Sequence, residues 1–194
     1  MEQNLPTHIA VIPDGNRRWA KTRGLDPWIG HHHGAQTVKE IIKESFNAGI
    51  KYFTFWSMSE DNIKKRSPLE VAFLFKLIKK AFGDFEKDSY THDNEIKVDF
   101  LGSWETLFPE DVKRVLYRVK EKTKKYSKHF LTFMMAYDGR SEMLQALEKI
   151  SKNNPVTQIT PELLKNNLLT AELPPVDLVV RTGGEPHWSA GFMM

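Results

Sequence analysis

Residues 8–19 are His8-Ile9-Ala10-Val11-Ile12-Pro13-Asp14-Gly15-Asn16-Arg17-Arg18-Trp19. The first five form a short apolar run, which predicts a buried strand, and Pro13-Asp14-Gly15-Asn16 predicts the turn that closes it. We expect a helix after the turn. A strand that passes through a polar turn into a helix is typical of a βαβ unit, so this stretch favours a parallel sheet.

The remainder of the chain continues this alternation. Runs of β-branched and aromatic residues predict further strands at 50–56, 96–102, 130–136 and 176–180. Helical spacing with start and stop residues predicts helices at 30–48, 67 to about 87, 109 to about 128, 140–151 and 161–169. We therefore expect a single α/β domain over residues 1–194, with a mostly parallel central sheet flanked by helices. In such sheets ligands bind outside the carboxyl ends of the strands.

Composition narrows the chemistry. The chain has 194 residues, 40% hydrophobic and 27% charged, which is typical of one ordinary globular domain. It has no cysteine, which excludes disulfides, thiolate zinc sites and a cysteine nucleophile, so any metal should be hard and oxygen-bound. The net charge of +3 suits anionic ligands but is too small to indicate a nucleic-acid surface. No apolar run is long enough to span a membrane, and we expect a cytoplasmic protein.

The first strand-end loop, residues 13–19, combines a carboxylate, turn formers and two arginines. Backbone N–H groups and arginine forks bind phosphate, and Asp14 could hold Mg²⁺ on the phosphate oxygens. The alternative is an Asx turn with the arginines on a solvated face. Arg17 and Arg18 lie where a helix dipole disfavours cations, which favours an anion there.

Two more loops follow strands. Residues 57–66 mix small polar groups with a basic cluster, as a polyphosphate site would, and the alternative is a solvated charge run. Residues 181–189 place glycines and Arg181 after the last strand, where backbone can approach a ligand closely; a plain glycine turn is the alternative.

Two other features allow two interpretations each. Gly30-His31-His32-His33-Gly34 suggests zinc, but adjacent histidines on a helix point in different directions, so one histidine that serves a phosphate is favoured. The aromatic helix that begins near Ser67 is either plain core or the wall of an apolar tunnel.

Together these loops resemble the cis-prenyltransferase family of the undecaprenyl diphosphate synthase type, which extends an allylic diphosphate with isopentenyl diphosphate. The match covers nearly the whole chain in order, and its first and last motifs are highly specific. The matching stretches are 8–21, Gly30-His31 with Gly34, 59–66 with Glu70-Val71, Tyr137 with Gly139-Arg140, and 177–185.

The resemblance implies roles for individual residues. Asp14 would hold Mg²⁺, and Asn62 would help to remove the proton; because an amide is no base, we expect Asn62 to orient a water or a diphosphate oxygen. The implied substrate-binding residues are Gly15, Asn16, Arg17, Arg18, Trp19, His31, Ser59, Glu60, Asp61, Ile63, Arg66, Arg181, His187, Trp188 and Ser189. Among these, Gly15, Asn16, Arg17, Arg18 and His31 would cradle the allylic diphosphate, and Trp19 would pack beside its prenyl chain. Ser59, Glu60, Asp61 and Ile63 would contact substrate, and Arg66 would bind a phosphate. Arg181, His187, Trp188 and Ser189 would bind isopentenyl diphosphate.

The resemblance also implies a homodimer. Because so apolar a product should be delivered to a bilayer, we also expect peripheral contact with a membrane. Several positions depart from the family pattern. Pro27 stands where an arginine is usual, with Arg23 as a substitute, and one extra residue makes Lys65 compete with Arg66 for the phosphate. His187 replaces an arginine. From the bulk of Phe73 and Phe75 we predict a product shorter than about eleven isoprene units.

Two alternatives are a non-catalytic partner subunit of the same fold and another α/β phosphate enzyme. A non-catalytic relative should lack Asp14, Arg17 and Arg18, which are present, and a phosphohydrolase needs several strand-end carboxylates, of which only Asp14 is well placed. In the family the chain continues past the last motif to a second acidic metal ligand. Because this sequence stops at Met194, we expect it to lack its C-terminal end.

Overall fold

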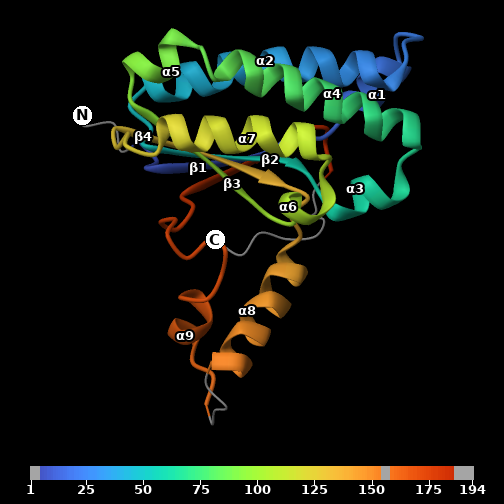
Figure 1. Cartoon of the computed structure of the whole chain (residues 1–194). Helices are drawn as coiled ribbons and strands as arrows, with labels where there is room; N and C mark the ends of the chain where they lie inside the picture. The colour runs from blue at the N-terminus through green and yellow to red at the C-terminus, as the bar shows by residue number, and fades with distance from the viewer. Residues whose placement is uncertain (1–4, 154–157, 186–194) are drawn as a thin grey trace.

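Five parallel strands form the centre of the molecule, as the computed structural model in Figure 1 shows; it describes residues 5–153 and 158–185. Every strand pairing is parallel, and the order across the sheet is β3-β4-β2-β1-β5. The strands are β1 (His8–Ile12), β2 (Tyr52–Met58), β3 (Ile96–Leu101), β4 (His129–Met135) and β5 (Leu178–Arg181). The predicted α/β fold with a parallel sheet is confirmed.

Strand β1 lies between β2 and β5. His8 is aligned with Tyr52 of β2, and Ile9 with Leu178 of β5. The chain thus moves to one side of β1 for β2, β3 and β4, and returns to the other side for β5. Such a reversal of strand order opens a crevice at the carboxyl ends of the strands, where open α/β sheets bind ligands.

Helices lie on both sides of the sheet. In Figure 1, α2, α4 and α7 cover one face, whereas α8 and α9 extend from the other side. The helices of the described residues are α1 (Asn16–Lys21), α2 (Pro27–Asn47), α3 (Glu60–Lys65), α4 (Pro68–Phe85), α5 (Ser89–Asp93), α6 (Trp104–Leu107), α7 (Glu110–Thr123), α8 (Gly139–Asn153) and α9 (Pro161–Lys165).

Several boundaries differ from the prediction. Helix α2 begins at Pro27 rather than Gly30, because proline at the first helical position has its backbone angle preset. Helix α7 ends at Thr123, well before the predicted Lys128, where the Thr123 hydroxyl donates to the Val119 carbonyl and the chain turns. Helix α9 stops at Lys165 rather than Leu169, and β2 is displaced two residues along the chain from the predicted 50–56.

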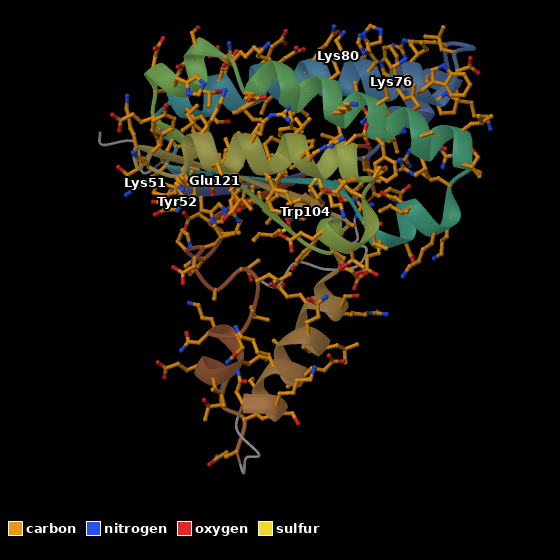
Figure 2. All side chains as sticks on the ribbon, viewed as in Figure 1. Lys51, Tyr52, Lys76, Lys80, Trp104 and Glu121 are labelled. Atoms are coloured by element: carbon orange, nitrogen blue, oxygen red, sulfur yellow. The ribbon has the colours of Figure 1, made fainter. Side chains whose placement is uncertain are left out.

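The main core lies between the sheet and the covering helices α2, α4 and α7. The aromatic rings of Phe82, Phe100 and Phe133 meet there with centroids 4.8 to 6.0 Å apart. Lys76 and Lys80 are exposed residues of α4 (Figure 2). None of the helices in residues 5–153 and 158–185 is long and apolar enough to cross a membrane.

Candidate active site

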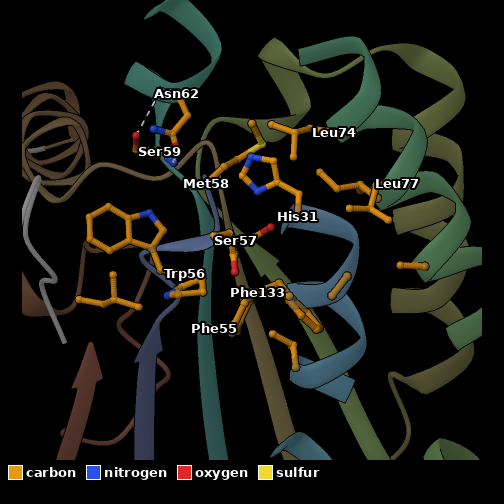
Figure 3. Close-up of a pocket in the computed structure, with 18 of the residues that line it drawn as sticks. His31, Phe55, Trp56, Ser57, Met58, Ser59, Asn62, Leu74, Leu77 and Phe133 are labelled. Atoms are coloured by element: carbon orange, nitrogen blue, oxygen red, sulfur yellow. Dashed lines mark hydrogen bonds between the residues drawn. The ribbon is translucent and has the colours of Figure 1, made fainter. Parts of the chain in front are cut away.

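A cavity of about 900 Å³ lies between α2, α4 and the carboxyl ends of the strands. In Figure 3, Ser59 and Asn62 mark its polar end, while Leu74 and Leu77 of α4 face Phe55 and Phe133 of the sheet farther in. The cavity therefore joins a charged mouth to an apolar interior.

Asp14 lies at the mouth, directly after β1. Its Oδ1 accepts a hydrogen bond from the Gly15 backbone N–H at 2.6 Å, and its Oδ2 accepts one from Arg181 Nη2 at 2.8 Å. Arg18 Nη2 is 3.3 Å from Oδ1. Partial burial acts to raise the pKa of Asp14, but the Arg181 and Gly15 hydrogen bonds and the charges of Arg18 and Arg181 outweigh it, so the pKa is lowered. Asp14 is a carboxylate at neutral pH.

Glycines allow the loops at the mouth to approach each other. A Cβ on Gly183, whose φ is +85°, would lie 2.9 Å from the Asp14 carbonyl oxygen. A Cβ on Gly30 of α2 would lie 2.1 Å from the Asn16 carbonyl oxygen, and one on Gly34 only 2.7 Å from the Asn16 side chain. Helix α1 can therefore sit against α2 only because both positions are glycine.

Two arginines and a histidine of the mouth converge on Glu70 of α4. His31 Nε2 is 3.2 Å from Glu70 Oε1, and Arg17 Nε and Arg66 Nη1 are each 3.6 Å from the same oxygen. Burial lowers the pKa of His31, and the charges of Arg66 and Arg17 add to this, while the Glu70 contact opposes it. His31 is therefore a neutral hydrogen-bonding group at neutral pH. Sequence reasoning had used Glu70 only as a helix-start and family-motif residue.

The prediction of a loop at residues 57–66 is wrong, because residues 60–65 form helix α3. Ser59 Oγ accepts from the Asn62 backbone N–H at 3.2 Å, and Asn62 Oδ1 accepts from the Ser59 N–H at 3.3 Å. This reciprocal capping offsets the weak helix propensities of Asp61 and Asn62. Since Oδ1 is engaged by the backbone, the Nδ2 group of Asn62 is the part that can donate to a ligand.

The inner part of the cavity is mainly apolar, although Gln36, Lys39, Lys80 and Asp84 of α2 and α4 also line the cavity. Its wall is formed by Ala35, Val38 and Ile42 of α2, Leu74, Leu77, Ile78, Ala81, Phe82 and Phe85 of α4, and Phe55 and Phe133 of the sheet. Phe73 and Phe75 do not line it: the Phe73 ring packs on Trp28 and the Phe75 ring on Phe108, with centroids 6.4 and 5.0 Å apart. The bulk of these two residues therefore gives no argument about product length.

The structure brings many predicted site residues together at the mouth. Those that line the cavity are Asp14, Asn16, Arg17, His31, Ser59, Asp61, Asn62, Arg66 and Arg181. Lys65 also lines it and pairs with Asp61, so the choice between Lys65 and Arg66 for the phosphate stays open.

Other predicted residues lie behind or beside the mouth. Gly15 and Arg18 contact Asp14, as above, and Arg18 also pairs with Glu185. Trp19 is exposed; its ring lies 5.1 Å from the His33 ring at a tilt of 50°, and the Arg23 guanidinium lies over it at 4.4 Å. Glu60 binds Lys64 and Ser103, and Ile63 packs on the core. His187, Trp188 and Ser189 lie outside the described residues.

Sequence reasoning assigned no role to Asp138 and Arg140, which line the cavity at the carboxyl end of β4. Their signal was present, because Tyr137 and Gly139-Arg140 were part of the family match and follow a predicted strand. The backbone N–H of Arg140 donates to Asp138 Oδ1 at 2.9 Å, which joins the two residues in one turn.

The donor set at the mouth fits Mg²⁺. Within the described residues no group of three or more His, Asp or Glu side chains could hold a metal by itself. Mg²⁺ in phosphate sites needs only one or two carboxylates, because substrate oxygens and water complete its shell. The ionised Asp14, which pairs with Arg18 and Arg181, meets that requirement.

Comparisons with known proteins agree with this geometry. The model of a family described as "Putative undecaprenyl diphosphate synthase" matches residues 12–194. The tritrans,polycis-undecaprenyl-diphosphate synthase (geranylgeranyl-diphosphate specific) of Pyrococcus furiosus is 36% identical over 186 residues, which are 93% of this chain and 70% of that protein. The isoprenyl transferase of Treponema denticola is 37% identical over 182 residues, 94% of this chain and 78% of that protein.

A solved structure is also similar. Lavandulyl diphosphate synthase from Lavandula x intermedia, crystallised in complex with dimethylallyl diphosphate, superposes with a TM-score of 0.90 at 28% identity, covering 97% of this chain and 82% of that one. The family match and the relatives together establish the kinship. The chain belongs to the undecaprenyl diphosphate synthase family, whose relatives named here are prenyl transferases and prenyl diphosphate synthases.

Proposed function

We propose that this protein condenses isopentenyl diphosphate with an allylic diphosphate in cis (Z) configuration and so makes a polyprenyl diphosphate. The observation that supports this most directly is the shape of the cavity, whose cationic mouth adjoins an aromatic and aliphatic interior. An allylic diphosphate has the same two parts, an anionic head and an apolar chain. The family relationship favours the same reaction class.

The reaction breaks the allylic C–O bond, forms a C–C bond to isopentenyl diphosphate and releases a proton. Negative charge grows on the departing diphosphate, so prearranged donors accelerate the step. Arg17, Arg66 and His31 are suited to bind this head group. Asn62 Nδ2 is suited to donate to the water or diphosphate oxygen that takes the proton. The apolar interior keeps water from the allylic carbon.

Asp14 is the residue that we expect to hold Mg²⁺, together with diphosphate oxygens. When bound, Mg²⁺ supplies charge neutralisation for the leaving group. The Asp14 carboxylate is oriented for this by the Gly15 N–H and Arg181. We assign the isopentenyl diphosphate site to Arg181 with His187, Trp188 and Ser189, in keeping with the family motif that follows β5.

The direct test is incorporation of labelled isopentenyl diphosphate onto dimethylallyl and geranylgeranyl diphosphates, the primers named for two relatives. We expect incorporation with Mg²⁺ and none after chelation. Asp14→Asn should lower the rate about a hundredfold or more, as loss of transition-state stabilisation does. The matched control is Asp26→Asn, since Asp26 is exposed, does not line the cavity and makes no capping hydrogen bond with its side chain.

Absence of incorporation by the intact protein with either primer would instead favour the non-catalytic partner subunit. We also propose a homodimer, as the family resemblance implies, and peripheral contact with a membrane, because the apolar product should be delivered to a bilayer. Sedimentation would test the first, and a monomer at assay concentration would contradict it. Full product release without lipid or detergent would contradict the second.

A further inference from the structure

Glu70 occupies a helix-start position but its carboxylate serves another purpose. Ser67, Pro68 and Glu70 begin α4 in the order S-P-L-E, which predicts a capping box. The first bond of that box is present, because Ser67 Oγ accepts from the Glu70 backbone N–H at 3.3 Å. The Glu70 carboxylate, which would return to the start of the helix in a box, contacts instead Arg17, His31 and Arg66 at the cavity mouth.

These three side chains come from separate elements. Arg17 belongs to α1, His31 to α2, and Arg66 ends α3, yet all three approach the single oxygen Oε1 of Glu70. All three line the cavity, whereas Glu70 does not and is only 5% exposed. Glu70 thus lies behind Arg17, His31 and Arg66 and holds them from the side away from the cavity.

The distances from Arg17 and Arg66 to Glu70 suit a residue that supports the two arginines rather than one that competes with a ligand for them. A charge-assisted hydrogen bond between a guanidinium and a carboxylate is about 2.7 to 2.9 Å long. Arg17 and Arg66 stay at 3.6 Å, so their attraction to Glu70 orients them without using their best donor geometry. Without an anion between them, Arg17 and Arg66 would also repel one another in a partly buried site.

We propose that Glu70 is a positioning residue that preassembles Arg17, His31 and Arg66 into the binding site for the diphosphate of the allylic substrate. The inference rests on the proposed function for the identity of that substrate. Glu70 itself touches no substrate and acts only through Arg17, His31 and Arg66.

The sign of one substitution separates positioning from charge. Glu70→Gln keeps the size of the side chain and removes its charge. If Glu70 only reduced the positive potential of the mouth, the variant would bind diphosphate more tightly, because one opposing charge is gone. If Glu70 positions Arg17, His31 and Arg66, the variant binds diphosphate more weakly, because these donors lose their common orientation.

The probe is inorganic diphosphate with Mg²⁺, titrated by calorimetry at fixed salt, so that no turnover is needed. We expect Glu70→Gln to bind it about tenfold more weakly, and to raise KM for the allylic diphosphate by a similar factor while kcat changes less than about threefold. Unchanged or tighter binding by the folded variant would overturn the inference.

A second variant distinguishes the loss of positioning from misfolding. Glu70→Asp keeps the charge but withdraws it by one methylene, so a positioning role predicts binding several-fold weaker than in the wild type, and unchanged binding contradicts it. The matched control is Glu142→Gln, since Glu142 is equally buried in the first turn of α8 but contacts Tyr137 and Thr170. It should lower Tm and leave diphosphate binding unchanged.

This test is independent of the reaction. If the wild type transfers no prenyl group but Glu70→Gln still weakens diphosphate binding, the proposed function fails and the positioning role stands. If the wild type is active and both Glu70 variants bind diphosphate as it does, the positioning role fails and the function stands.

Discussion

The two ends of the Asn62 side-chain amide have different roles. Its oxygen accepts from the Ser59 backbone and completes the cap of α3, so only its NH₂ group is available to a ligand. The same residue therefore fixes the helix and presents a donor to the cavity. This arrangement explains why an amide, which cannot accept a proton as a base, can occupy a position linked to proton removal.

Replacing Asn62 by Asp tests that division. The carboxylate of Asn62→Asp can still accept from the Ser59 N–H, so stability should change by less than about 1 kcal/mol. It cannot donate, and it adds a negative charge beside the diphosphate, so kcat should fall about a hundredfold. The measurement is steady-state prenyl transfer beside thermal denaturation.

The control for this substitution is Asn94→Asp, at a residue whose amide caps the end of α5 far from the cavity. It should leave kcat unchanged. A fully active Asn62→Asp enzyme would show that donation by the amide is unnecessary.

At the scale of elements, the contact of α1 with α2 determines where Arg17 lies. Gly30→Ala would place a methyl group 2.1 Å from the Asn16 carbonyl oxygen, which the rigid backbone cannot accommodate. We expect a loss of about 1 to 3 kcal/mol in the free energy of unfolding and weaker substrate binding, because α1 must shift. Urea unfolding and the KM for the allylic substrate measure the two effects.

Gly83→Ala is the matched control, because Gly83 is also helical but a Cβ there meets nothing within 4 Å. Alanine should stabilise α4 by about 0.5 to 1 kcal/mol through its better helix propensity. Equal effects of the two substitutions would refute the steric explanation.

Helix α4 also limits the depth of the cavity. From Glu70 to Phe85 it spans about 22 Å along its axis, at about 1.5 Å per residue. Phe82 and Phe85 pack with Phe133 at the far end, with centroids 4.8 and 6.4 Å from that ring. Phe85→Ala should therefore open this end and lengthen the product by one or more isoprene units, as chromatography of the products would show.

Phe75→Ala serves as the comparison for Phe85→Ala. Phe75 packs on Phe108 outside the cavity, so its loss should lower stability and leave product length unchanged. The same product distribution from both variants would argue that the cavity end does not limit the chain.

At the scale of the whole molecule, three buried histidines link stability to pH. Burial lowers the pKa of His8, His31 and His129, so the folded chain binds fewer protons than the unfolded chain below about pH 6.5. The free energy of unfolding should thus decrease as pH falls from 7.5 to 5.5, by on the order of 1 kcal/mol or more in total. The carboxylates with lowered pKa, such as Asp14, lose their contribution only at more acidic pH.

Urea unfolding at these two pH values and constant ionic strength measures this effect. His129→Gln keeps a donor for the Ile50 carbonyl, which the His129 Nδ1–H now contacts at 3.0 Å, and it should remove part of the pH dependence. Equal free energies of unfolding for the wild type at both values would contradict the assignment.

Periodicity and turn residues in the sequence were enough to predict the α/β class, all five strands and the loop after β1. These features are local, because a strand, its turn and the following helix are encoded within a few tens of residues. Helix α3 was not predicted because Asp61 and Asn62 are poor helix formers. In the folded chain, reciprocal capping hydrogen bonds between Ser59 and Asn62 offset this weak propensity. The wall of the cavity was misassigned to Phe73 and Phe75, because both faces of α4 are apolar.

The sequence by itself determined the chemistry available at the strand ends: aspartates, several arginines and a histidine, with no thiol. Only the tertiary structure decided which of these groups meet. Asp14 and Arg181 are 167 residues apart and pair because β5 returns beside β1. Arg17, His31 and Arg66 share one oxygen of Glu70 because three helices converge there. Such meetings depend on strand order and on the rotation of packed helices, which no local pattern records.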